Sequence, residues 1–178
     1  MGFLPDDLIT DEIPSLRAEF IDAMRRAATG VSVVTTDGQA GRFGVTVSAV
    51  ASVSADPPML LVCINRRSPS WAAIQANGVF TVNLLSEMQA HVADSFAGRA
   101  AAPFDFTCAD WADDDMALPP RLHGAVAAFH CRIAQAHDAG SHAVVIGHVV
   151  NAFAGAAAPL AYVAQNYAST ARLESKAA

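Results

Sequence analysis

The sequence predicts a mainly β protein, an antiparallel barrel or sandwich with a few flanking helices. Its apolar residues fall into many short segments bounded by turn residues, and only two or three segments have helical spacing. Strands and helices do not alternate regularly, which argues against a doubly wound parallel sheet. The 178 residues suffice for one complete core, and we divide them into an N-terminal extension (1–14), one domain (15–170) and a C-terminal tail (171–178).

The first half of the domain is predicted to contain one helix and three strands. Ser15 is a suitable N-cap, Leu16, Phe20 and Met24 recur at helical spacing, and Gly30 ends the helix. The strands are expected at 31–36, 44–54 and 59–65, with turn residues at 37–41. The last strand, MLLVCIN, is an unbroken apolar run, typical of a strand buried on both faces.

The second half begins with a short helix that has Ser68 at its N-cap, Pro69 at its first position and Asn77-Gly78 at its end. The elements expected after it are a strand at 79–85, a helix with a Ser86/Gln89 capping box that ends near Gly98, an irregular stretch at 99–122, a hairpin of strands 125–137 and 142–153 joined by DAGS, and a short strand after Pro159.

The composition excludes several classes of protein. Charged residues make up only 16% of the chain against a usual share of about 25%, so a large buried interface and a homodimer are expected. A net charge of −6 argues against general nucleic-acid binding. The three cysteines have no CxxC spacing, so neither a disulfide framework nor a zinc site is indicated. The N-terminus has no signal-peptide pattern and no apolar run approaches about 20 residues, so we expect a soluble, cytoplasmic protein.

Residues 44–54, GVTVSAVASVS, place small hydroxyls on one side of a predicted strand. Thr46, Ser48, Ser52 and Ser54 alternate with apolar residues, and only Val50 interrupts the polar set. An ordinary solvated strand face is the simple alternative. That face would normally carry charged residues, which are missing here, and its small side chains let a flat molecule approach the backbone.

The segment NRRSPS (65–70) follows a predicted strand and starts a helix, where free N–H groups and the helix dipole favour an anion. Arg66 and Arg67 add charges suited to phosphate oxygens, and the hydroxyls of Ser68 and Ser70 lie at the same place. The alternative is a capping serine beside two solvated arginines. A planar ring joined to a phosphate by a short polar chain would suit both segments, and FMN is such a molecule.

Several segments together resemble the flavin reductase components of two-component flavin monooxygenases, in particular those serving 4-hydroxyphenylacetate and pyrimidine hydroxylation. They are FxxAM (20–24), VSVVTTDG, GVTVSAVASVS, DPPMLLVCINRRS, FxVNLLS and GSHxxxxGHV, and the resemblance covers about residues 16–167. It implies a Greek-key split β-barrel, a homodimer, a groove for FMN or FAD, NADH or NADPH as electron donor, and a separate monooxygenase that receives reduced flavin.

The resemblance also implies site residues. Thr46, Val47, Ser48, Ala49 and Ser52 would contact the flavin ring and ribityl chain, and Asn65, Arg66, Arg67 and Ser68 its phosphate. Phe96 would lie near the flavin, Arg99 would reach the phosphate side, and Tyr167 is a further candidate. His142 would lie over the flavin where nicotinamide docks. Ser141 stands where many members have aspartate, which removes a carboxylate that orients the ring.

The other histidines are assigned to packing or to solvated surface, and no third ligand joins His142 and His148, so no metal is expected. His142 need not act as an acid or base, since an imidazole over the flavin can fix the hydride donor. Two other functions stay open: a non-catalytic flavin carrier or sensor, and a split-barrel oxidase acting on a pyridoxine-type amine or a haem-like substrate.

Overall fold

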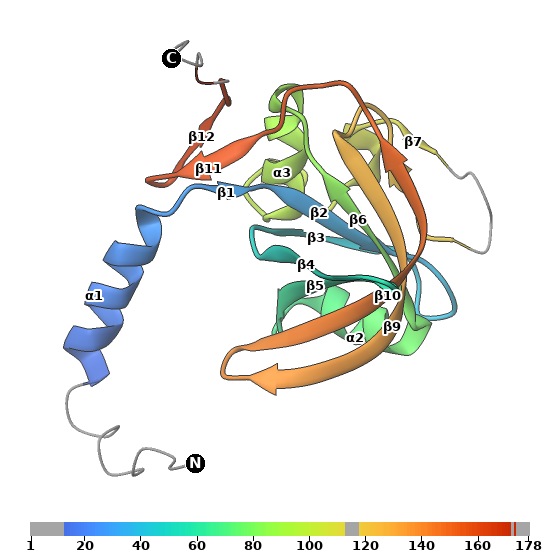
Figure 1. Ribbon diagram of the computed structural model, residues 1–178, viewed down its shortest axis with the longest axis horizontal. Helices are drawn as coiled ribbons and strands as arrows, with labels where there is room; N and C mark the ends of the chain where they lie inside the picture. The colour runs from blue at the N-terminus through green and yellow to red at the C-terminus, as the bar shows by residue number, and fades with distance from the viewer. Residues whose placement is uncertain (1–12, 113–117, 172, 174–178) are drawn as a thin grey trace.

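The computed structural model describes residues 13–112, 118–171 and 173, and its centre is a curved sheet of seven strands. Neighbouring strands are antiparallel and follow the order β3-β2-β6-β9-β10-β5-β4 (Figure 1). The strands are β2 (Ser32–Thr36), β3 (Phe43–Val47), β4 (Val50–Ala55), β5 (Pro58–Asn65), β6 (Val79–Leu84), β9 (Ala127–Ala139) and β10 (His142–Ala154). The predicted mainly β architecture is confirmed, and so is the predicted hairpin around DAGS, which β9 and β10 form.

The hydroxyl-rich segment 44–54 is two strands, and the prediction of a single strand was wrong. Chain neighbours β3 and β4 form the two opposite edges of the sheet, and Ser48 and Ala49 connect them. The sheet curves enough for β3 to contact β5, which gives the split barrel. Val50, the residue that interrupts the polar alternation, is the first residue of β4. The break in the polar alternation at Val50 therefore marks the split between β3 and β4.

The described residues form three α-helices: α1 (Ile13–Arg25), α2 (Pro69–Asn77) and α3 (Ala90–Phe96). Smaller elements are β1 (Thr29–Gly30), β11 (Ala161–Val163) and β12 (Asn166–Ala168) in one sheet, β7 (Trp111–Ala112) and β8 (Arg121–Leu122) in another, and 3-10 turns at Glu87–Gln89 and Phe106–Cys108. Both predicted ends of α1 were wrong: the helix begins at Ile13, before the expected N-cap Ser15, and ends at Arg25, whereas Gly30 lies in β1. In Figure 1 α1 stands apart from the sheet.

The helix-end predictions agree with the structure at the other two helices. Ser68 caps α2, and Gly78 ends it in the left-handed conformation with φ 71°. The Ser86–Gln89 capping box is present, and the Ser86 N–H donates to Gln89 Oε1 at 3.0 Å. It caps a short 3-10 turn that leads into α3, so the helix proper begins later than expected.

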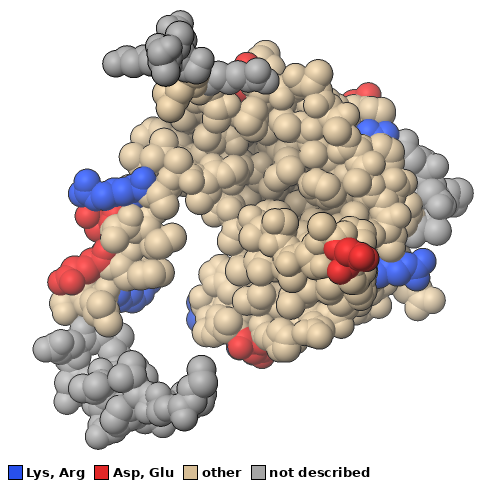
Figure 2. Space-filling model, viewed as in Figure 1, with Lys and Arg blue, Asp and Glu red and all other residues tan. Residues whose placement is uncertain are grey.

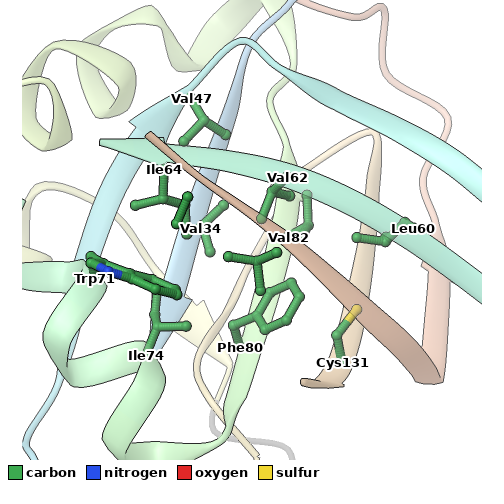
Figure 3. Packing of buried hydrophobic residues seen from close by; sticks show 12 residues of the cluster. Val34, Val47, Leu60, Val62, Ile64, Trp71, Ile74, Phe80, Val82 and Cys131 are labelled. Carbon is green, nitrogen blue, oxygen red and sulfur yellow. The ribbon is translucent and has the colours of Figure 1, made fainter. Parts of the chain in front are cut away.

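The main core fills the inside of the curved sheet and is closed by α2. Figure 3 shows Trp71 and Ile74 of α2 against strand residues that include Val34, Ile64 and Phe80. Each such side chain contributes roughly 1.5–3 kcal/mol when fully buried. A second cluster lies under α3, where the Phe96 ring packs edge-on against Phe106 and Trp111.

Strand β2 is the strand buried on both faces, whereas that prediction was wrong for residues 59–65. In β5 buried residues alternate with partly exposed ones, because the side of the sheet with Leu61 and Cys63 is not covered. All of β2 is buried between the two cores. Its hydroxyl residues did not suggest a buried strand in the sequence. They are buried because Thr35 and Thr36 each donate to a backbone carbonyl at 2.7 Å, which satisfies their hydroxyls.

Candidate functional site

Ser48, exposed at the split between β3 and β4, lines three adjoining hollows. We name the largest of the three, of about 450 Å³, the mouth hollow. Its lining combines the hydroxyls of Ser32, Ser48, Ser52 and Ser54 with apolar side chains that include Leu60, Leu84, Phe129 and Val149. The hydroxyl-bearing side of β4 thus faces a partly apolar recess that suits a flat ring with polar edges.

A second hollow, of about 180 Å³, lies on the other side of Ser48, and we name it the arginine hollow. It is lined by Val31, Thr46, Val47, Ser48, Ala97, Arg99, Tyr162 and Tyr167. The Thr46 hydroxyl donates to the Ala93 carbonyl of α3 at 2.7 Å, so it ties β3 to the helix. Five of the predicted cofactor-binding residues meet in this hollow.

Asp94 holds Arg99 and Tyr167 of the arginine hollow together. Its Oδ1 accepts from Arg99 Nε at 2.9 Å and from the Tyr167 hydroxyl at 2.8 Å, and Arg99 Nη2 also donates to that hydroxyl. Burial and the hydrogen bond to Asp94 raise the pKa of Tyr167 to about 12, so the phenol stays protonated at neutral pH. Sequence reasoning missed Asp94, since its contact with Tyr167 joins residues 73 positions apart.

A third cluster lies where β5 runs into α2. Asn65, Arg66, Arg67, Trp71 and Ser141 line a hollow of about 550 Å³, which we name the helix-start hollow. Asn65 is also the register partner of His142 in the β5–β10 ladder. The structure therefore brings His142 next to the predicted phosphate-binding segment. His142 is exposed, and its Nδ1 lies 2.9 Å from Ser141 Oγ.

The backbone N–H groups at this helix start are engaged, which corrects the expectation that they are free for an anion. The Arg67 N–H donates to Asn65 Oδ1 at 2.9 Å, and the Ser70 N–H donates to the capping Ser68 Oγ at 3.3 Å. The Ser68 and Trp71 N–H groups donate to backbone carbonyls. The Ser70 hydroxyl is buried and donates to Gly44 O at 2.8 Å. Anion binding here depends on side chains.

Arg66 and Arg67 differ in their surroundings although both are exposed. Arg66 Nη2 lies 2.9 Å from Asp138 Oδ2, and Nη1 donates to the Gly140 carbonyl at 3.3 Å. Arg67 has no ion pair or side-chain hydrogen bond to any residue that the structure describes. Of the two guanidinium groups, that of Arg67 is the one available to a ligand.

Two predicted contact residues have side chains turned away from solvent. The Phe96 ring is fully buried, and its atoms lie close enough to Gly44 that an added Cβ there would be about 2.5 Å from Cε1. Phe96 therefore supports β3 from behind, and a direct contact with a ligand is not open to it. The Val47 side chain packs in the main core and is only 7% exposed. Ala49 is exposed, and its carbonyl accepts from the Cys63 N–H at 3.1 Å.

Among the described residues no three His, Cys, Asp or Glu side chains are grouped as a metal would require. His130 is buried, with Nδ1 2.7 Å from the Thr81 hydroxyl, as its assignment to packing predicted. No helix in the described part of the chain is long and apolar enough to cross a membrane.

Residues 24–171 match the family described as "Flavin reductase like domain". A relative from Variovorax paradoxus, the FMN reductase (NADH) RutF, is 40% identical over 152 residues, which are 85% of this chain and 84% of that protein.

Two solved structures are also similar. Nitrilotriacetate monooxygenase component B from Mycobacterium thermoresistibile is 30% identical, with a TM-score of 0.79 over 93% of this chain and 96% of the other. The NADH:FAD oxidoreductase SgcE6 of Streptomyces globisporus, in complex with NAD and FAD fragments, is 26% identical, with a TM-score of 0.79 over 99% and 100%.

Proposed function

The chain belongs to the flavin reductase like domain family, and we propose that it is an NADH-dependent FMN reductase that supplies reduced flavin to a separate monooxygenase. Relatives at about 40% identity are named as NADH-dependent FMN reductases, and one similar structure is a component of a monooxygenase. The observation in this chain that carries the proposal is the split at Ser48, with a recess on each side. Arg99 lines one recess, and Arg67 lies at the adjacent helix start.

The residues around Ser48 fit a flavin. The mouth hollow joins hydroxyls to an apolar floor, which matches a ring that is apolar on its faces and polar at its edge. The backbone from Thr46 to Ala49 would lie along that edge, with Ser52 beside it. Flavin, when bound, supplies the acceptor for the hydride of NADH.

The two arginine sites would serve phosphate groups. Arg67, without a side-chain partner in the described part of the chain, would hold the FMN phosphate beside Asn65 and Ser68. Arg99 is held by Asp94 and Tyr167 at the opposite side of the split, and its remaining N–H groups suit a second anionic group. Two such sites suit a protein that binds two phosphate-bearing molecules, FMN and NADH.

His142 would orient the nicotinamide. It lies at the start of β10, beside the end of β5, and its exposed imidazole has one nitrogen next to Ser141 Oγ. The other nitrogen is left to hydrogen-bond a carboxamide, which would fix the hydride donor at reacting distance. No proton transfer by His142 is required for this role.

Purified chain is expected to oxidise NADH only when FMN is added, with FMN consumed as a substrate. Under anaerobic conditions one NADH should bleach one FMN, measured by the visible absorbance of flavin. The same assay with NADPH and with FAD tests the preference for NADH and FMN. A chain that binds FMN but does not reduce it would be a carrier or sensor, and one that needs an amine substrate would be an oxidase.

The chain is further proposed to act as a homodimer. Leu16, Phe20 and Met24 form the apolar face of α1 and are 64%, 60% and 52% exposed. A 13-residue helix is marginal alone in water, so this face needs a partner surface. Figure 2 shows few charged residues on the sheet body beside α1. A hollow of about 280 Å³ between α1 and the split includes Phe20, Met24 and Ser48, so α1 also borders the site.

Light scattering at micromolar concentration is expected to give twice the chain mass of 18.5 kDa. Phe20→Asp should shift the mass toward one chain, because it places a carboxylate within the apolar face, whereas Glu19→Gln on the same helix should not. A monomeric mass for the parent chain contradicts the dimer.

The reaction is further proposed to take place in the cytoplasm.

A further inference from the structure

Arg66 joins the start of α2 to the turn between β9 and β10. Its Nη2 lies 2.9 Å from Asp138 Oδ2, and Nη1 donates to the Gly140 carbonyl at 3.3 Å. Its backbone N–H donates to the Ser141 carbonyl at 3.0 Å. Arg66 thus contacts Asp138 near the end of β9 and both residues of the turn, Gly140 and Ser141, that precedes His142.

We propose that Arg66 is a positioning residue that fixes this turn, and with it His142, instead of binding the flavin phosphate. The proposal rests on the function proposed above, in which His142 orients the nicotinamide. The resemblance to flavin reductase components implied phosphate contacts for both arginines. The structure divides their roles, with Arg66 assigned to the turn and Arg67 left for the anion.

Charge supports the division. Asp138 neutralises the Arg66 guanidinium, and both terminal nitrogens of that group already have an oxygen partner. A phosphate bound to the remaining N–H groups of Arg66 would lie close to the Asp138 carboxylate, which repels it. Arg67 has no such competitor among the residues that the structure describes.

The connection from Arg66 to the imidazole is short. Arg66 holds the carbonyl of Ser141, and Ser141 Oγ lies 2.9 Å from His142 Nδ1. Gly140 has φ 57°, a left-handed conformation that lets the chain reverse tightly before Ser141. The ladder with β5 fixes the His142 backbone opposite Asn65. What remains variable is the turn itself, which projects beyond the sheet body in Figure 1.

An exposed ion pair adds little to global stability. Arg66 would therefore act by fixing the position of the turn and of His142. A displacement of reacting groups by about 1 Å is enough to cost up to a hundredfold in rate. Removal of the guanidinium leaves the backbone contact to Ser141 in place, and we therefore expect a smaller loss than removal of His142 causes.

Arg66→Ala is expected to lower the rate constant for reduction of bound FMN by NADH about tenfold, in stopped-flow measurements at saturating FMN. Its FMN dissociation constant should stay within about twofold of the parent value, and its thermal midpoint should not change. Asp138→Ala should lower the same rate constant, and the double variant should be no slower than Arg66→Ala alone. Arg132→Ala, an exposed arginine on β9 away from the turn, is the matched control.

Two measurements separate this proposal from the proposed function. Amide hydrogen exchange at residues 138–142 should be faster in Arg66→Ala than in the parent, whatever reaction the protein catalyses. Exchange of the charges, Arg66→Asp with Asp138→Arg, should restore part of the reduction rate. A tenfold weaker FMN affinity with an unchanged reduction rate would make Arg66 a phosphate ligand and overturn the proposal. Failure of the parent chain to reduce FMN would instead reject the function.

Discussion

Replacing Arg67 with alanine is expected to weaken FMN binding by about ten- to a hundredfold, because a charge-assisted hydrogen bond to the phosphate is lost. The N–H groups of the neighbouring turn do not replace this contact, since they donate to Asn65 Oδ1, to Ser68 Oγ and to backbone carbonyls. The side chain would therefore carry most of the attraction. Titration of flavin fluorescence gives the dissociation constant directly.

Salt and a conservative variant sharpen this test. The affinity of the parent should fall as ionic strength rises, and that dependence should be weaker in Arg67→Ala, which has one cation fewer. Arg67→Lys keeps the charge but loses the bidentate geometry of the guanidinium, so its FMN affinity should lie between those of the parent and Arg67→Ala. If Arg67→Ala binds FMN as the parent does, Arg67 is solvated surface and the phosphate lies elsewhere, with Arg99 the next candidate.

Local rules predicted the helix ends and strands that local chemistry determines. Ser68, Gly78 and the Ser86–Gln89 pair have the predicted capping roles, since a cap depends on residues a few positions apart. The break at Val50 was visible only as one residue out of phase. That β3 and β4 lie at opposite edges of the sheet depends on closure of the barrel, which no short segment encodes.

The candidate site shows the same limit. Sequence reasoning identified Ser48, Arg67, Arg99 and His142 as site candidates, and the structure places them around the split or at the adjacent helix start. It did not reveal the use of the Arg66 guanidinium by a turn more than 70 residues later. Nor did it reveal that the Phe96 ring is buried. An aromatic residue on a helix face has the same sequence pattern whether it packs in a core or beside a cofactor.

Asp94 is instructive because its role is purely tertiary. It accepts from Arg99 five positions along the chain and from Tyr167 on the last strand. The first contact resembles an ordinary exposed ion pair, which would count for little. Only the second, which brings β12 against α3, indicates that the pair helps to shape the recess beside Ser48.

Replacing His142 with alanine is expected to slow reduction of bound FMN by NADH by about ten- to a thousandfold, since the nicotinamide would lose the group that holds it at reacting distance. FMN affinity should stay nearly unchanged, because Arg67 and the residues of the split do not depend on the imidazole. Stopped-flow mixing of the FMN-loaded protein with NADH measures this step free of product release.

The control for this variant is His137→Ala, which removes an exposed imidazole from the same hairpin, where its ring hydrogen-bonds to Gln135 Oε1 at 3.2 Å. It should reduce FMN at the parent rate. A rise in the NADH concentration required for half-maximal rate, together with the slower step, would assign His142 to nicotinamide docking. If His142→Ala instead reduces FMN at the parent rate but binds it poorly, then His142 belongs to the flavin site. The nicotinamide must in that case dock on another side of Ser48, and the turn that Arg66 holds would serve the flavin.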